Sequence, residues 1–143
     1  MAANEDLTQM LAAVDIFREV PPKMLKRIAD SGKVVDFAPG HEVTTGGSHG
    51  VAFHLVTDGS AEVEVGGRPR GTLRPGQGFG EISLIDGLPR SATVRAGDGG
   101  LQTFALSAWE FRPLLEENPT VAYALLKGLC ARLRAAEAAL DAS

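Results

Sequence analysis

The sequence has a single cysteine, Cys130, so it cannot form an internal disulfide or a cluster of thiolate metal ligands. It has no excess of basic residues either, because 14 Lys and Arg are outnumbered by 18 Asp and Glu, giving a formal net charge of −4. Broad capture of nucleic acid needs a concentrated basic face, so direct DNA binding is not expected. A small anion can still be held by one local positive site.

Long hydrophobic runs are also missing. No apolar segment approaches the roughly 20 residues that a helix needs to cross a bilayer, so membrane insertion is not expected. The first ten residues, MAANEDLTQM, lack the basic and apolar regions of a secretory signal peptide. We therefore expect a cytoplasmic protein. Its 143 residues suffice for a single core and are too few for two ordinary domains.

Both ends of the chain are predicted to be helical. From Asn4 to about Asp30, apolar residues recur at three- and four-residue spacing, and Pro21–Pro22 separates a first helix from a second. Near the other end, Ser107 is predicted to cap a helix, with Glu110 as its capping-box partner. A long final helix is predicted to reach about Ala139.

The middle of the chain, from Val34 to about Leu106, is predicted to be β-structure. Short runs rich in β-forming residues alternate with turn residues, and most of the 17 glycines lie here. Several short strands at roughly 8–12-residue spacing are typical of a sandwich or a closed barrel, and a jelly roll fits best. The predicted breaks are Pro39–Gly40, Gly46–Gly47, Asp58–Gly59, Gly66–Gly67 and Gly97–Gly100.

The stretch FGEISLIDGLPRSATVRA, residues 79–96, places Glu81 nine residues before Arg90 in an otherwise apolar segment. One interpretation is a weak ion pair between the two across a surface turn. The other is that each binds a ligand. Gly76, Gly78 and Gly80 favour the ligand, because they expose the backbone before a short helix predicted to begin near Glu81, and helix N-termini bind anions. Arg90 can hold two oxygens of such an anion, and Ser91 adds a donor.

A carboxylate repels phosphate, so Glu81 is expected to accept a hydrogen bond from a sugar hydroxyl instead. Phosphate and ribose together indicate a small nucleotide. The segments FGEISL (79–84) and PRSATV (89–94) resemble the phosphate-binding cassette of the cyclic-nucleotide-binding domain family, which includes protein kinase A regulatory subunits, catabolite activator proteins and cyclic-nucleotide-gated channels. The resemblance covers nearly the whole chain, and it includes a hairpin turn at Asp58–Gly59.

This resemblance implies a single domain over residues 1–143 that is mainly β with flanking helices. The implied parts are a helical lead-in at 1–31, an eight-stranded jelly-roll β-barrel at 32–106 with the cassette at 78–94, and closing helices at 107–143. It also implies that Glu81 binds the ribose 2′-hydroxyl and Arg90 the cyclic phosphate. The other implied ligand contacts are Gly80 at the sugar, Ser91, Ile82 and Ala92 at the phosphate, and Val63, Phe79 and Arg132 at the base. For Arg132, a solvated helix charge is the alternative.

Members of this family switch conformation on binding and do no chemistry, so the resemblance implies a regulatory sensor that is not an enzyme and needs no cofactor. We favour cAMP as the ligand; cGMP is the alternative, because a hydroxyl at the position of Ser91 accompanies cGMP preference in some members. The ligand is expected to close residues 124–140 over the pocket. The output is expected from a separate protein or from a domain outside these residues, because no helix-turn-helix region follows the last helix.

Three alternatives remain open. The apolar stripe on the last helix either packs on its own domain or joins two copies into a homodimer. A ligand-free jelly roll serving only as an interaction module is a second possibility. A cupin-like metal-binding protein is the third; against it, His41, His49 and His54 contain no His-x-His pair.

Overall fold

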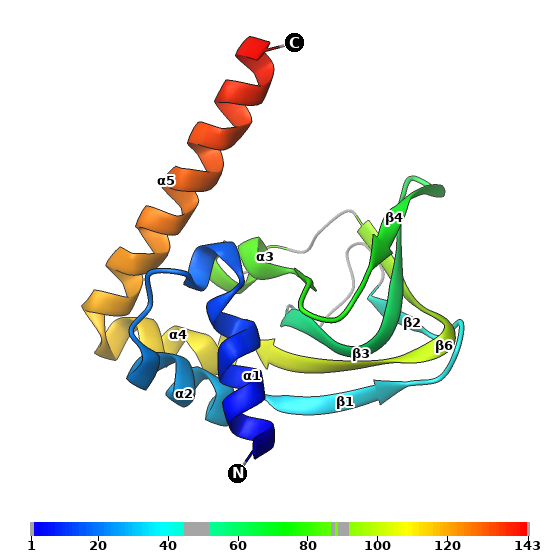
Figure 1. Ribbon diagram of the computed structural model, residues 1–143, viewed down its shortest axis with the longest axis horizontal. Coiled ribbons are helices and arrows are strands. Elements are labelled where there is room, and N and C mark those ends of the chain that lie inside the picture. The colour runs from blue at the N-terminus through cyan, green and yellow to red at the C-terminus, as the bar shows by residue number, and fades with distance from the viewer. Residues whose placement is uncertain (1, 45–51, 87, 89–91, 143) are drawn as a thin grey trace. The chain divides into compact units, whose positions relative to one another are not determined.

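The two ends of the chain form a helical unit, and its middle forms a β unit (Figure 1). The structure is a computed structural model that describes residues 2–44, 52–86, 88 and 92–142. The helical unit consists of residues 1–30 and 113–143, and the β unit consists of residues 31–112.

The β unit contains one antiparallel sheet. Its described residues form six strands in which β1, β6, β3 and β4 are neighbours in that order, while β2 pairs with β6 and β5 pairs with β3. The mainly β architecture with flanking helices is therefore confirmed. Eight strands in a closed barrel are not confirmed, because the described sheet does not close. The strands are β1 (Lys33–Phe37), β2 (Glu42–Thr44), β3 (Ala52–Val65), β4 (Arg68–Leu73), β5 (Gly78–Phe79) and β6 (Ala92–Ser107).

The predicted breaks at Asp58–Gly59 and Gly97–Gly100 are wrong. Both segments lie inside continuous strands, where Asp58 pairs with Gln102 and Gly59 pairs with Leu101, with shifts of register on both sides. Gly59 has a φ of 78°, and a Cβ there would lie 2.2 Å from the carbonyl oxygen of Gly100. Glycine here lets the long strands bend against each other without ending them.

The predicted turn at Gly66–Gly67 is confirmed. Both glycines have positive φ angles, 60° and 77°, as a two-residue type I′ hairpin requires, and Val65 pairs with Arg68 across it. This turn joins β3 to β4, the strand at one edge of the described sheet. Arg68 and Pro69 lie on this edge strand, and both residue types discourage pairing with another chain.

A buried hydrophobic cluster holds the bent part of the sheet together. It includes Phe79 of β5, and partly buried residues of four strands, among them Val63, pack against it. The buried members are Val56, Ala61, Phe79, Val94, Ala96 and Leu101.

The helical unit is built from both ends of the chain. Its elements are α1 (Ala2–Ala12), the short 3₁₀ helix η1 (Asp15–Phe17), α2 (Pro22–Ser31) and α5 (Pro119–Ala142). The predicted start of the second helix at Pro22 is confirmed. Helix α5 approaches η1 closely at Gly128, where a Cβ would lie 2.8 Å from the Cα of Ile16. A glycine at this point allows the two backbones to come into contact.

Helix α4 (Ala108–Glu117) contains residues of both units. Its predicted capping box is confirmed: the Ser107 hydroxyl accepts a hydrogen bond from the N–H of Glu110 at 3.0 Å, and the Glu110 carboxylate accepts one from the N–H of Ser107 at 3.1 Å. Among the described residues, no helix is long and apolar enough to span a membrane.

Candidate functional site

The segment that leads into the predicted cassette is attached to β3 by its backbone. The N–H of Val56 donates to the carbonyl of Gln77 at 2.8 Å, and the N–H of Gly76 donates to the carbonyl of Val56 at 2.9 Å. At Gly78 a Cβ would lie 2.6 Å from the ring of Phe53, so a side chain there would force the segment away from the strand. The glycine brings the segment directly against the sheet.

The short helix α3 (Glu81–Asp86) begins where the sequence predicts it. Gly80 precedes it with a φ of 90°, which favours glycine, and its carbonyl accepts a hydrogen bond from the N–H of Leu84 at 3.1 Å. Glu81 is half-buried in the first turn, where a carboxylate is stabilised by the helix dipole. Leu84 is buried, whereas Ile82 is 45% exposed. The helix therefore presents one apolar face to the protein and keeps Ile82 toward solvent.

Phe79 lies in the hydrophobic cluster, immediately before Gly80 and Glu81. Its ring stacks on that of His54, with centroids 5.0 Å apart and planes 10° apart. His54 is itself buried, and its Nδ1 is joined by a 2.9 Å hydrogen bond to Oγ1 of Thr103, which is fully buried in β6. This chain of contacts ties the start of the cassette to two strands. The predicted contact of Phe79 with a base remains a prediction.

Val63 and Ala92 occupy neighbouring ladder positions of β3 and β6. Val63 pairs with Val94, and Ala92 pairs with Val65. Val63 packs against the cluster that contains Phe79. The two residues predicted to contact the base, Val63 and Phe79, therefore lie at the same core. Arg90 and Ser91, the predicted phosphate partners, lie outside the described residues, so their predicted roles rest on the sequence.

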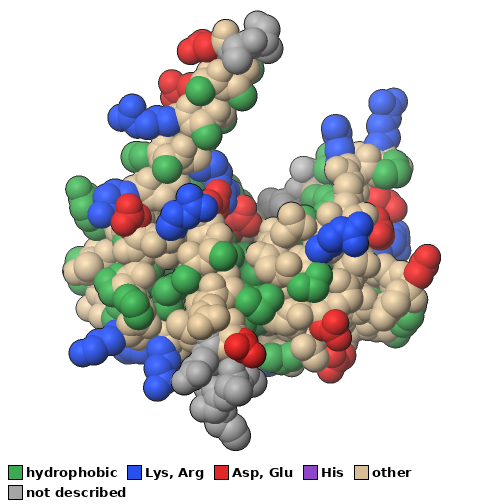
Figure 2. Space-filling view, viewed as in Figure 1, with side chains coloured by type: hydrophobic (Ala, Val, Ile, Leu, Met, Phe, Trp, Pro, Cys, Tyr) green, Lys and Arg blue, Asp and Glu red, His purple; other side chains and the backbone are tan. Residues whose placement is uncertain are grey.

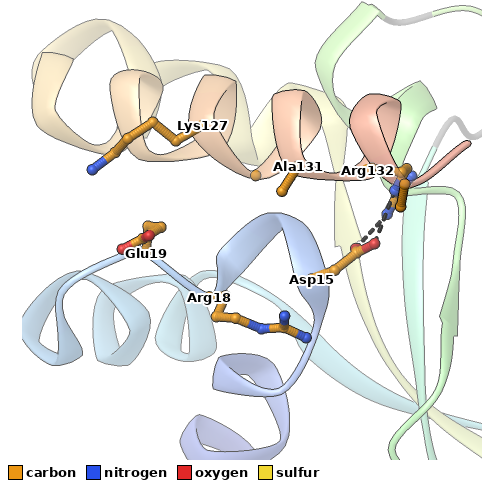
Figure 3. A pocket seen from close by; sticks show the side chains of 8 residues that line it. Asp15, Arg18, Glu19, Lys127, Ala131 and Arg132 are labelled. Carbon is orange, nitrogen blue, oxygen red and sulfur yellow. Dashed lines mark hydrogen bonds and ion pairs between the residues drawn. The ribbon is translucent and has the colours of Figure 1, made fainter. Parts of the chain in front are cut away.

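The remaining predicted site residue, Arg132, belongs to the helical unit and forms an ion pair with Asp15. Its Nε donates to Oδ2 of Asp15 at 2.9 Å, and a second guanidinium nitrogen donates to Oδ1 (Figure 3). This hydrogen bond to Arg132 is the main reason that the pKa of Asp15 lies below its ordinary value of 3.8. The contact of Arg132 with a base remains a prediction.

A groove of about 310 Å³ lies beside this pair, between η1 and α5. Its walls carry charges of both signs, including Arg18, Glu19 and Lys127 (Figure 3). The ammonium of Lys127 also lies 5.2 Å from the ring centroid of Tyr123. The groove is therefore a polar surface feature of the helical unit and contains none of the predicted cassette residues.

Two structural partners could not be predicted from the sequence. Asp15 is separated from Arg132 by 117 residues, and Thr103 is separated from His54 by 49, so no local spacing indicates either contact. As for metals, the described parts of the chain contain no group of three His, Cys, Asp or Glu side chains that could hold an ion.

Comparison with known proteins identifies the family of the chain. The model of the family described as the cyclic nucleotide-binding domain matches residues 34–118, which include β1 to β6, α3 and α4. The chain belongs to this family. A cyclic nucleotide-binding domain therefore occupies most of the sequence.

Named relatives come from several kinds of protein. The chain is 29% identical over 118 residues, 82% of its length, to a cAMP-dependent protein kinase regulatory subunit of Debaryomyces hansenii. It is 35% identical over 88 residues, 62% of its length, to a cGMP-dependent protein kinase of Toxoplasma gondii. It spans only 26% and 9% of these two relatives, respectively.

A solved structure matches over almost its whole length. The N-terminal domain of a transcriptional regulator from Streptomyces coelicolor superposes with a TM-score of 0.81 at 26% sequence identity. The match covers 92% of this chain and 94% of that one. The fold is thus shared with a domain of a transcriptional regulator.

Proposed function

We propose that the domain binds a cyclic nucleoside monophosphate, with cAMP favoured over cGMP, and acts as a regulatory sensor that catalyses no reaction. The observation that carries this proposal is the start of α3: Glu81 opens the helix directly after Gly80, which has a positive φ and no side chain. The surrounding segments 79–84 and 89–94 resemble the phosphate-binding cassette of the family, which supports the proposal. Relatives named for cAMP and for cGMP support the ligand class.

In this proposal each polar group of the nucleotide has a partner. The guanidinium of Arg90 holds two oxygens of the cyclic phosphate, and Ser91 and the N–H groups of Ile82 and Ala92 add donors. The carboxylate of Glu81 accepts the hydrogen bond of the ribose 2′-hydroxyl. The base is held by three further residues, Val63, Phe79 and Arg132.

Calorimetric titration of the whole chain with cAMP and with cGMP tests the proposal. Arg90→Ala should weaken binding by about 2–5 kcal/mol, because a charged hydrogen-bonded pair loses one partner. Glu81→Gln should cost less, because an amide oxygen still accepts from the ribose. Arg70→Ala is the matched control, since it removes an exposed arginine of β4.

Equal binding by the parent and Arg90→Ala would reject the phosphate assignment. A well-folded parent that binds neither nucleotide would favour the ligand-free interaction module. Binding of cGMP in preference to cAMP would keep the site and change only the ligand.

The response to ligand is proposed to be closure of the last helix over the nucleotide. A ligand that binds the closed form better shifts the population toward it. Amide hydrogen exchange with and without cAMP measures this directly: stronger protection within residues 124–140 is expected, and unchanged protection there would reject the lid. The signal then passes to an output protein or domain that lies outside these residues.

The same helix is also proposed to join two copies of the chain. Leu126, Leu133 and Leu140 recur every seven residues on α5 and are 59%, 61% and 75% exposed. Hydrophobic side chains lie along the visible length of this helix (Figure 2). Sedimentation should show a dimer that Leu133→Glu dissociates, and a monomeric parent at all concentrations would reject this assembly.

A further inference from the structure

The contact between Arg132 and Asp15 occupies the guanidinium with a carboxylate of the protein itself. Two of its nitrogens donate to the two carboxylate oxygens, which is the arrangement that arginine uses for carboxylates and phosphates in general. The pair is partly shielded, since Arg132 is 31% and Asp15 44% exposed. An incoming ligand group must compete with this contact before it can use Arg132.

Local structure holds Asp15 in place for this contact. Its Oδ1 also accepts the N–H of Ile16 at 2.8 Å, which fixes the carboxylate at the start of η1. One helical turn before Arg132, Gly128 brings the backbone of α5 against Ile16. The ion pair and the backbone contact together fasten one turn of α5 to η1.

We propose that Asp15 sets the affinity of the domain for its nucleotide by holding Arg132 on η1. This inference rests on the proposed function, in which Arg132 contacts the base. The guanidinium is bound to Asp15 in the structure, and in this proposal it reaches the base only in molecules whose ion pair has opened. The apparent affinity is then reduced by the fraction of molecules with the pair open.

Removing the charge of Asp15 separates this role from simple packing. Asp15→Asn keeps the size of the side chain and the oxygen that accepts the hydrogen bond from the N–H of Ile16. It removes the negative charge and so weakens the ion pair with Arg132. We expect roughly two- to fivefold tighter binding of cAMP, the size of the contribution of a partly exposed ion pair. Arg132→Gln breaks the same pair but removes the base contact, so it should weaken binding.

The opposite signs of these two variants form the decisive readout. If the pair only fastened α5 to η1, both variants would shift the affinity in the same direction. In the proposal Asp15 acts on binding only through Arg132. Asp15→Asn should then have no effect on the affinity in the Arg132→Gln background. Glu117→Gln is the control, because it removes one negative charge from an exposed ion pair of the same unit, 4.0 Å from Arg27, and should leave the affinity unchanged.

Titration calorimetry with cAMP on the four single and double variants and the parent measures all of this. Asp15→Ser serves if the asparagine variant is unstable, and Asp15→Asn/Glu19→Gln checks whether the second carboxylate of the groove replaces the first. Unchanged or weaker binding by both Asp15 variants, or equal signs for Asp15 and Arg132, would overturn the inference. Failure of the parent to bind any cyclic nucleotide would instead reject the proposed function.

Discussion

His54 of β3 and Phe79 of β5 stack nearly parallel, and the histidine is hydrogen-bonded in turn to Thr103 of β6. The residue directly before Gly80 and Glu81 is thereby connected to the two longest strands of the sheet. Glu81 follows Phe79 by two residues, so it lies close to this stack. The position of the proposed ribose-binding carboxylate thus depends on a buried polar contact beneath it.

Thr103→Val should destabilise the fold by about 1–3 kcal/mol, because it removes the hydroxyl that is bonded to buried His54 without changing the shape of the side chain. Thr72→Val is the control, since the hydroxyl of Thr72 bonds to Glu62 at an exposed position and its loss should cost less than about 0.5 kcal/mol. Urea denaturation measures both. Similar small values for the two variants would show that the buried hydrogen bond adds little stability.

Gly59→Ala should destabilise the fold by about 3 kcal/mol or more. The positive φ disfavours any side chain, and the added Cβ would also meet the carbonyl oxygen of Gly100 at 2.2 Å. Gly66→Ala, where φ is also positive but the space is open, should cost only about 1 kcal/mol. Denaturant unfolding of the two variants gives the comparison, and equal losses would contradict the close approach of β3 and β6.

Ser107→Ala should lower the stability by about 1 kcal/mol, because the first turn of α4 loses its side-chain cap. Glu110→Gln should cost less, since the amide oxygen can still accept from the N–H of Ser107. Thermal unfolding should show a decrease of about 4 °C for the serine variant. A larger loss from the glutamine variant would indicate that charge at the helix N-terminus matters more than the cap.

The ion pair of Asp15 should make stability depend on pH. Because the folded pKa of Asp15 lies below its ordinary value of 3.8, the pair stabilises the fold above that pH, and this contribution is lost as the pH falls through the folded value. Asp15 is 44% exposed, so the effect should not exceed about 1 kcal/mol. The difference in free energy of unfolding between the parent and Asp15→Asn should be largest near neutral pH and shrink in acid. A difference that stays constant with pH would exclude this origin.

The sequence predicts those parts of the fold that depend on neighbouring residues. The helix start at Pro22, the turn at Gly66–Gly67 and the capping of α4 by Ser107 each follow from a short pattern with a local physical cause, and all three are confirmed. The same is true of the helix that begins at Glu81. Local chemistry decides the structure at these points.

The sequence does not predict the place of a glycine whose role depends on a distant strand. Gly59 and the glycines at 97–100 look like turn residues in the sequence, yet they lie inside β3 and β6 because two distant strands meet there. The contacts of Asp15 with Arg132 and of His54 with Thr103 depend on the tertiary fold in the same way. The roles predicted for Arg90 and Ser91 stay predictions, as do the other ligand contacts.

Strand β6 runs without interruption from Ala92, within the cassette, to Ser107, the residue before α4. At roughly 3.3 Å per residue its path is on the order of 50 Å long, and it bends where its glycines meet Gly59 of β3. If the cassette binds phosphate as proposed, a displacement of Ala92 would act on the same strand from which the first turn of α4 begins.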